Sequence, residues 1–386
     1  MHHSFFRKRK LMIFLSAKLI TSFGSLLSYF AVPLIVYSLY HSGFVLSIFE
    51  LGSMVPSILL SVPLGLYLRN KNVKKVWFMS SFIAGLYLLF LSFQINIYTL
   101  FFLNFLLSVL SILVGISSQT IIVEIVGRDK LQWANTLMLS IIAINGILAP
   151  IVGSILLAIS WQFVFLIDAL TYFTEGILVC LLPVSGLYSA PRRKISAEVK
   201  TVIEYLRKNE KVKYSILTLF FTLLLVGGAR ILNVDYFNLF SSTYEYYGLA
   251  MSASALGMFI VLLIQNLKIL KINNSYRASV LTLPFYSLFF FLIFISPSPL
   301  LSALSFLLLG FVNGIISPSL ISAVQANTDR EMLPQVMGLW KNFGGIAQLS
   351  SVMWIGFAVD VISPKILYLG IGLSLLVLFL FVGNVK

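Results

Sequence analysis

The chain has few of the residues on which soluble proteins and enzymes rely. Only 10% of its 386 residues are charged and 59% are hydrophobic, whereas soluble domains carry about 25% charged residues. Its single cysteine, Cys180, cannot form a disulfide within the chain. The three histidines, His2, His3 and His41, complete neither a metal cluster nor a catalytic triad. We therefore expect no metal, no cofactor and no enzymatic activity.

Two further absences narrow the class of protein. No G-x-x-x-x-G-K-[ST] loop occurs and no segment is large enough for a nucleotide-binding domain, which excludes an ATP-driven pump. The net charge is +14, but the chain has no soluble domain on which basic residues could form a patch. No nucleic-acid partner is therefore expected. The mean hydropathy of +0.99 instead predicts an integral membrane protein whose main partner is the lipid bilayer.

Long apolar runs are abundant, and each can be read as a helix because about 20 apolar residues span a bilayer. The sequence predicts about twelve such helices. The first six are expected over residues 11–38, 44–68, 76–95, 97–123, 134–160 and 162–184, and the second six over residues 214–240, 246–268, 278–296, 299–325, 335–360 and 365–383. The prediction is an all-α integral membrane protein with two six-helix bundles, residues 1–184 and 214–386, joined by a cytoplasmic loop over residues 185–213.

Lysine and arginine residues indicate the orientation of these helices. They collect in short cytoplasmic loops of membrane proteins, and 23 of the 27 fall in the two termini, the central loop and every second loop between helices. Lys365 is the one basic residue in the loops predicted to lie outside. Both termini are therefore predicted to be cytoplasmic, in a multi-pass protein of the plasma membrane.

An internal repeat supports two related halves. The segment "GISSQTIIVEIVGRDKLQWANTLM" begins at Gly115, and "GIISPSLISAVQANTDREMLPQVMGLW" begins at Gly314. Each contains the end of a helix, a polar connector and the start of the next helix, which indicates a repeat. Parallel six-helix repeats are typical of transporters that bind substrate between the halves, near the middle of the membrane. We therefore expect pseudo-symmetric bundles and a small-molecule substrate.

Four segments occur in an order and spacing typical of one known family. They are "LITSFGSLLSYFAVPLIVYSL" near the start, "GRDKLQWANTL" before the fifth helix, "GILAPIVGSIL" (Gly146, Pro150, Gly153) within it, and "FLIDALTYF" in the sixth helix. Together they resemble the major facilitator superfamily and, within it, the branch of macrolide-efflux and enterobactin-exporter-like proteins. The resemblance covers nearly the whole chain and implies the major facilitator fold and a role in efflux.

Two positions depart from the pattern of that family. The loop after the second helix, "GLYLRNKNVKK", keeps Gly65 and the basic residues Lys74 and Lys75, which the family uses in a cytoplasmic gate. Arg69, however, stands where the family has an acid that helps to latch this gate. In the first helix, Ser25 stands where the branch usually has an acid. The resemblance therefore implies no proton site in the first helix. It also does not establish that the cytoplasmic gate is latched in the way usual for the family.

Seven ionisable residues lie within predicted helices, where a charge at the membrane centre costs about 2.5–3.5 kcal/mol. They are Lys18, Glu50, Asp168, Glu175, Arg230, Asp235 and Lys341. Exposing all of them to lipid would cost on the order of 20 kcal/mol, so we expect them to face the bundle interior or to pair. Burial disfavours the charged form of a carboxyl group and so lets it load and release a proton. The four acids are therefore candidates for proton coupling.

Polar stripes occur on two of the predicted helices. On the sixth helix, Asp168, Tyr172 and Glu175 are spaced four and three residues apart and share one face. The resemblance implies a structural hydrogen bond for Asp168, which lies in the family signature, whereas Glu175 lies beyond it. On the first helix a second stripe is predicted to line the cavity, although close helix packing would use the same small residues; its members are Lys18, Ser22, Ser25 and Tyr29. Further cavity or substrate candidates are Asn104, Arg230, Lys341 and Gln348.

These features favour a secondary active transporter that exports amphipathic small organic molecules by proton-coupled alternating access. Facilitated or proton-coupled uptake is the first alternative. A membrane protein that keeps the fold without transporting is the second, and the altered gate loop favours it, whereas the charges inside the helices favour a transporter. The transporter is expected to be a monomer with protons as a second partner.

Overall fold

The chain folds almost entirely into α-helices in the computed structural model. The structure describes residues 2–68, 71–127, 131–185, 205–206, 209–240, 243–266, 275–329 and 332–383. No β-strand lies within these ranges. Arg69 and most of the predicted central loop, residues 185–213, lie outside the described residues.

The helices follow the predicted runs closely. The N-terminal half contains α1 (His2–Tyr40), α2 (Gly43–Tyr67), α3 (Val73–Leu91), α4 (Ile97–Val126), α5 (Leu131–Ile159) and α6 (Trp161–Leu181). The C-terminal half contains α8 (Glu210–Val226), α9 (Ala229–Phe237), α10 (Thr243–Asn266), α11 (Ser275–Ile295), α12 (Pro299–Ala326), α13 (Leu333–Val359) and α14 (Pro364–Val382). Within the described ranges, 12 helical stretches are long and apolar enough to cross a membrane, with α8 and α9 counted as one. The predicted all-α membrane fold is therefore confirmed.

The seventh predicted helix, residues 214–240, is interrupted rather than continuous. It divides into α8 and α9 at Gly227 and Gly228. A Cβ atom on Gly228 would lie 2.7 Å from the Ser351 carbonyl oxygen of α13, and the Gly228 N–H donates to Ser351 Oγ at 2.9 Å. The glycines are therefore required because α13 packs directly against the break.

Short polar side chains fix the starts of several helices. Asn72 caps α3, Ser160 caps α6 and Ser298 caps α12. In each cap the side-chain oxygen accepts a hydrogen bond from a backbone N–H of the first turn. Asn96 and Thr99 form a reciprocal capping box at the start of α4. Local sequence therefore sets where these helices begin, and the apolar runs set how far they extend.

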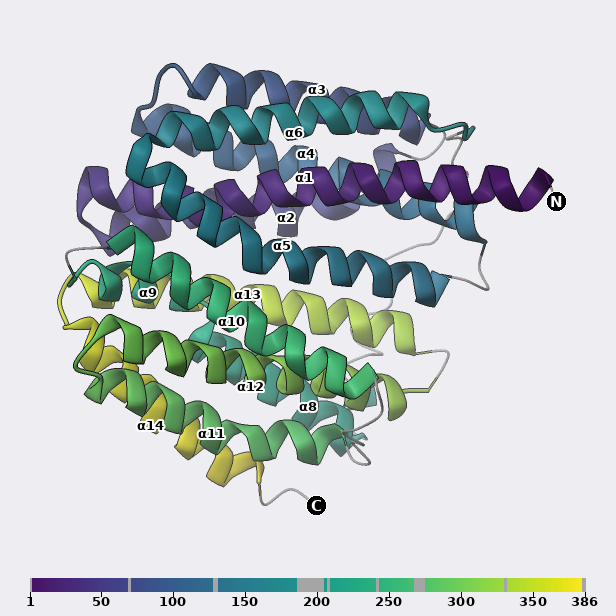
Figure 1. Cartoon of the computed structure of the whole chain (residues 1–386). Helices are drawn as coiled ribbons and strands as arrows, with labels where there is room; N and C mark the ends of the chain where they lie inside the picture. Colours follow the sequence, from purple (N-terminus) through teal and green to yellow (C-terminus); the bar gives the residue numbers. More distant parts are fainter. Residues whose placement is uncertain are drawn as a thin grey trace. The chain divides into compact units, whose positions relative to one another are not determined.

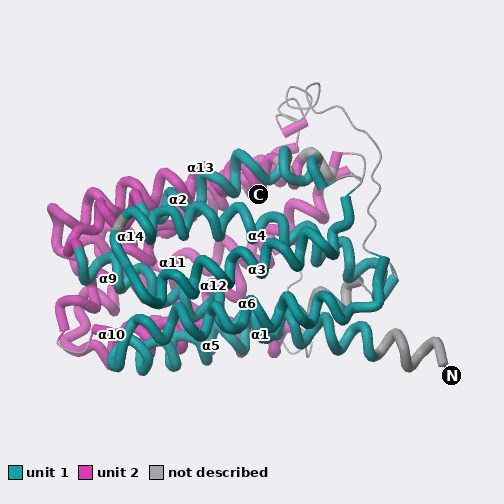
Figure 2. The backbone as a smooth tube through the Cα atoms, turned by 90° about the horizontal axis from the view of Figure 1, so that it is seen from above, with its two compact units in different colours: residues 1–39, 49–191 teal, residues 40–48, 192–386 magenta. Residues whose placement is uncertain are grey.

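Two compact units make up the chain (Figure 2). Unit 1 contains residues 1–39 and 49–191, and unit 2 contains residues 40–48 and 192–386. The sequence assigns residues 40–48 to the N-terminal bundle, whereas the structure groups them with unit 2. The α2 helix therefore begins in unit 2 and continues in unit 1.

Each unit is held together by helices that run side by side. In unit 1, α3 packs along both α6 and α4 (Figure 1). One end of this unit has a hydrophobic core of side chains from α1, α3, α4, α5 and α6, which includes the fully buried Trp77. In unit 2, α12 packs along α10 and α11, and α11 also packs along α14. The packing of α6 against α3 places the acids of α6 inside unit 1.

The first turn of α2 is capped by the residue that follows α13, within unit 2. Asp360 follows directly after α13, and its Oδ1 accepts from the Gly43 N–H at 2.6 Å. Its Oδ2 accepts from Ser42 Oγ at 2.7 Å and from the Phe44 N–H at 3.1 Å. A carboxylate at a helix N-terminus satisfies free backbone donors and is favoured by the helix dipole. Asp360 therefore fixes the start of α2 to the end of α13.

Replacing this cap is expected to weaken the fold. Asp360→Ala should lower the free energy of unfolding by about 1 kcal/mol, the usual cost of losing an N-cap acceptor. Asp360→Asn should cost less because one acceptor oxygen remains. Denaturant titration of the purified protein in detergent measures both changes, with Asp329→Ala at another exposed position as the control. Equal effects at the two aspartates would contradict the assignment.

Candidate functional site

The candidate site is built on α6, which carries two carboxyl groups inside a helix able to cross a membrane. Asp168, Tyr172 and Glu175 are all buried on this helix. Both acids have 0% of their side-chain surface exposed. A buried charge is stable only when it is paired or hydrogen-bonded, so the partners of each acid define the chemistry of the site.

Among the described residues, the side-chain hydrogen bonds to the Asp168 carboxyl group come from hydroxyl groups. Ser28 Oγ of α1 donates to Asp168 Oδ2, and Thr171 Oγ1 donates to Asp168 Oδ1 at 3.3 Å. The Thr171 hydroxyl also lies 2.7 Å from the Asp168 carbonyl oxygen, one turn back on the same helix. Within the described part of the chain, no lysine or arginine forms an ion pair with Asp168. The carboxyl group is therefore solvated by neutral donors.

Glu175 lies two turns along α6 and has a different environment. Its Oε1 pairs with Lys18 Nζ of α1 at 3.4 Å, and its Oε2 accepts from Ser81 Oγ of α3 at 2.6 Å. The Lys18 side chain is 21% exposed, whereas that of Glu175 is fully buried. Glu175 is therefore half of an ion pair that joins three helices.

Trp77 supports the cation of this pair. Lys18 Nζ lies 4.5 Å from the centroid of the Trp77 ring, within the range of a cation–π interaction. Phe14 contacts the same ring edge-on at 5.6 Å. Between the two acids, Ser25 Oγ donates to Tyr172 Oη at 3.2 Å. Lys18, Ser25 and Ser28 of α1 thus meet Glu175, Tyr172 and Asp168 of α6 in antiparallel order.

Gly24 permits this close approach of α1 to α6. A Cβ atom there would lie 2.1 Å from Thr171 Oγ1 and 2.5 Å from Asp168 Oδ1, which are overlapping positions. Glycine is thus required by the space that the α6 side chains occupy. Gly24 therefore has a physical role in the site.

The residues of the predicted stripe on α1 have different neighbours. Lys18 and Ser25 contact α6, whereas Ser22 Oγ accepts from Asn145 Nδ2 of α5 at 2.5 Å. The Tyr29 side chain is 59% exposed. The spacing correctly places these residues near one another along α1, but two of them bind α6 and one binds α5. A role in lining a substrate cavity stays a prediction for this set.

The fifth-helix motif places α5 against α1. A Cβ atom on Gly153 would lie 2.6 Å from a ring carbon of Phe30, and Asn145 Nδ2 also donates to the Leu19 carbonyl oxygen at 2.9 Å. Pro150 is buried, and Gly146 lies next to Asn145 on the same helix. This motif therefore acts within unit 1 as a packing surface for α1.

The other candidates of unit 1 have structural contacts. Asn104 Nδ2 of α4 donates to the Phe49 carbonyl oxygen of α2 at 2.5 Å, next to Glu50, whose surface is 7% exposed. In the predicted gate loop, Lys74 Nζ donates to the Leu182 carbonyl oxygen at the end of α6 at 2.6 Å. A cation there is favoured by the helix dipole. Gly65 is partly buried and Lys75 is exposed.

The candidates of unit 2 lie apart from one another along the chain. Arg230 and Asp235 are partly buried in α9, which is anchored by a hydrogen bond of 2.5 Å from Tyr368 Oη to Asn233 Oδ1. Lys341 and Gln348 are exposed and lie seven residues apart on α13, so they share one face.

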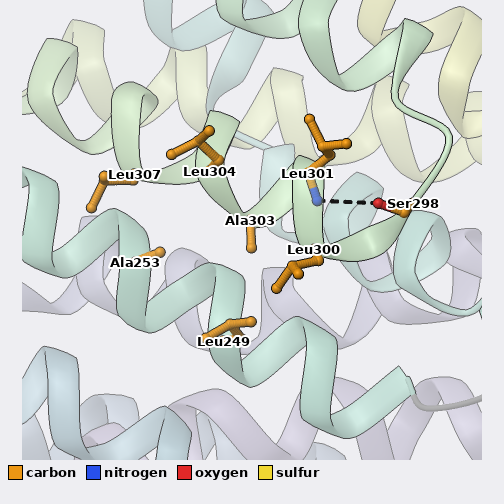
Figure 3. Close-up of a pocket in the computed structure, with 8 residues that line it drawn as sticks. All are labelled: Leu249, Ala253, Ser298, Leu300, Leu301, Ala303, Leu304 and Leu307. Carbon is orange, nitrogen blue, oxygen red and sulfur yellow. Dashed lines mark hydrogen bonds between the residues drawn. The ribbon is translucent and has the colours of Figure 1, made fainter.

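A groove of 460 Å³ lies between α10 and α12 of unit 2 (Figure 3). Its lining is almost wholly apolar and consists of Leu249, Ala253, Ser298, Leu300, Leu301, Ala303, Leu304 and Leu307. None of the predicted site residues lines it. Within the described ranges, no group of three or more histidine, cysteine, aspartate or glutamate residues could hold a metal ion.

In the described ranges, twelve stretches long and apolar enough to cross a membrane lie in two compact units, with an ion pair inside one of them, as is typical of an integral membrane protein of transporter architecture. The family model described as Major Facilitator Superfamily matches residues 14–352, so the chain belongs to the Major Facilitator Superfamily. No curated protein matches the sequence. The family places the chain among membrane transporters.

Solved structures of transporters have the same fold. The nucleoside transporter NupG is 17% identical with a TM-score of 0.75, covering 98% of this chain and 100% of that one. A mutant of the peptide transporter POT in complex with alafosfalin is 17% identical with a TM-score of 0.74, covering 95% and 93%. The human organic anion transporter MFSD10 is 14% identical with a TM-score of 0.68, covering 97% and 99%. At these identities, the likeness concerns the fold alone.

Sequence reasoning missed several members of the site. Ser28, Ser81, Trp77 and Asn145 contribute a hydroxyl, a ring or an amide to the contacts described above. Ser28 carries a weak signal because it follows Ser25 by three residues on one face of α1. Trp77 and Ser81 are four residues apart on α3 and so share a face, but nothing in the sequence identifies α6 as the partner of that face.

Adding a methyl group at Gly24 is expected to separate α1 from α6. Gly24→Ala should lower the free energy of unfolding by about 1–3 kcal/mol, the usual cost of overpacking. Gly115→Ala is the matched control, because a Cβ atom at Gly115 meets nothing within 4 Å and alanine favours the helix. Thermal unfolding of both purified variants tests this, and equal losses of stability would contradict the close α1–α6 contact.

The two members of the ion pair are expected to be coupled in stability. Lys18→Gln or Glu175→Gln alone should destabilise the protein by a few kcal/mol, because each strands a charge in the bundle. The double variant should be more stable than the Glu175→Gln and Lys18→Gln variants. A double-mutant cycle by denaturant titration measures the coupling energy, and additive losses would show that the two side chains do not interact.

Proposed function

We propose that this protein is a secondary active transporter that exports amphipathic small organic molecules by alternating access, coupled to proton movement. The observation that carries this proposal is the pair of fully buried carboxyl groups on a membrane-crossing helix. Acids inside transmembrane segments are costly and mark proton or ion pathways in pumps and transporters. A protein that served only as a scaffold would have no need of them.

The chemistry around the acids suits proton binding. A hydroxyl group can donate to a carboxylate and accept from a carboxylic acid, and both acids have such partners in Ser28 and Ser81. Asp168 can therefore gain or lose a proton without losing its hydrogen-bonded neighbour. The other acids predicted for coupling, Glu50 and Asp235, are kept as secondary candidates.

The direction of transport rests on the resemblance of four sequence segments to macrolide-efflux and enterobactin-exporter-like proteins. The solved relatives carry nucleosides, peptides and organic anions according to their names, which favours small organic substrates without selecting one class. The distribution of basic residues supports a protein with both termini in the cytoplasm. We further propose that it works as a monomer in the plasma membrane.

Transport in sealed vesicles tests the proposal. Purified protein in proteoliposomes with an imposed pH gradient should move at least one compound from a panel of lipophilic cations, macrolides and siderophores. Asp168→Asn or Glu175→Gln should reduce gradient-driven movement by at least tenfold, whereas Glu245→Gln, at an exposed position of α10, should not. Movement unaffected by the gradient favours facilitated uptake, and no movement of any compound favours the non-transporting alternative.

A further inference from the structure

The two acids of α6 differ in what protonation would do to their surroundings. Lys18 Nζ lies 3.4 Å from Glu175 Oε1, and Glu175 is its one ion-pair partner among the described residues. If Glu175 took up a proton, the ammonium group of Lys18 would lose its counter-charge while four-fifths buried. Since a stranded buried charge is strongly unfavourable, the carboxylate of Glu175 is needed as the partner of Lys18.

Asp168 has no such constraint. Its side-chain partners in the described chain are the hydroxyls of Ser28 and Thr171, and no cation would be stranded by its protonation. The Thr171 hydroxyl already has a second acceptor, the Asp168 carbonyl oxygen at 2.7 Å. The Ser28 hydroxyl can turn from donor to acceptor. Every group around Asp168 therefore stays hydrogen-bonded in either protonation state.

The other helices that pack against α6 do not change this balance. Helix α5 has no ionisable side chain. On α3, Lys74 is bound to the Leu182 carbonyl oxygen and Tyr87 to the Thr99 carbonyl oxygen. On α6 itself, Tyr172 accepts from Ser25, and Glu175 lies two turns away from Asp168. Among the described residues, Lys18 is therefore the cation that pairs with an acid of α6.

A change in the charge of Asp168 also affects its hydrogen bond to a second helix, α1. Its Oδ2 accepts from Ser28 of α1, and its Oδ1 lies 2.5 Å from the position that a Cβ atom on Gly24 would take. Uptake of a proton converts a charge-assisted hydrogen bond between α1 and α6 into a neutral one, which is weaker. The state of Asp168 thus alters the strength of the α1–α6 contact.

We propose that Asp168 is the proton-carrying group of this transporter, whereas Glu175 is the ion-pair partner that positions Lys18 and joins α1, α3 and α6. This assignment rests on the proposed function and separates the roles of its two carboxyl groups. The sequence offers all four acids inside helices as proton-coupling candidates, and the resemblance implies a structural hydrogen bond for Asp168; the assignment selects Asp168 from these candidates. Glu175 is a positioning residue, and its counter-ion Lys18 is kept in place by the Trp77 ring.

Infrared difference spectroscopy tests this assignment without any substrate. Spectra of the full-length protein in lipid, recorded at high and low pH, should contain the carbonyl stretching band of a protonated carboxyl group. The band should be lost in Asp168→Asn and kept in the double variant Lys18→Gln/Glu175→Gln. Asp329→Asn, at an exposed position, is the control for surface acids and should leave the band in place.

A second variant keeps the test decisive if Asp168→Asn fails to fold. Ser28→Ala keeps the acid and removes one hydrogen bond, so it should shift the frequency of the same band. A band that disappears in the double variant and persists in Asp168→Asn, or that Ser28→Ala leaves unshifted, overturns the assignment. Because no transport is measured, a negative transport assay would refute the proposed function and leave this result standing.

Discussion

The cost of placing charge in a membrane is the constraint on which unit 1 depends. Asp168 and Glu175 are enclosed on a helix long and apolar enough to cross a bilayer, so each needs partners supplied by the protein. Those partners come from α1 and α3. Gly24 lets α1 approach the acids closely, and Ser28 and Ser81 donate hydrogen bonds to them. These three residues therefore meet the requirement for partners.

The site also shows how one helix can hold two acids of different character. Glu175 pairs with Lys18, whose ammonium group lies over the Trp77 ring, whereas the hydrogen-bond donors to the Asp168 carboxyl group within the described residues are hydroxyls. The two environments lie two turns apart and share the same pair of helices, α1 and α6. A short stretch of the bundle thus combines an ion pair with a carboxyl group that is held by hydroxyls.

Much of the fold could be predicted from the sequence because hydropathy and helix length are local properties. The twelve spans and the shared face of Asp168, Tyr172 and Glu175 follow from composition and periodicity. The partners could not be predicted in the same way, since Lys18 and Glu175 are 157 residues apart in sequence. Periodicity gives the residues on one face of a helix, but not the helix that this face meets. For the same reason, the α1 stripe was expected to face one cavity, whereas its members contact both α5 and α6.

The start of α2 has a consequence for dividing the chain. Asp360 receives three hydrogen bonds from residues 42–44, which belong with unit 2 although they precede most of unit 1 in the sequence. A cut in the central loop would yield two fragments, and the C-terminal fragment would lack the segment that occupies this carboxylate. Co-expressed halves would therefore have to exchange a piece of helix before either was complete, so the protein is two units in packing but not two separable pieces of chain.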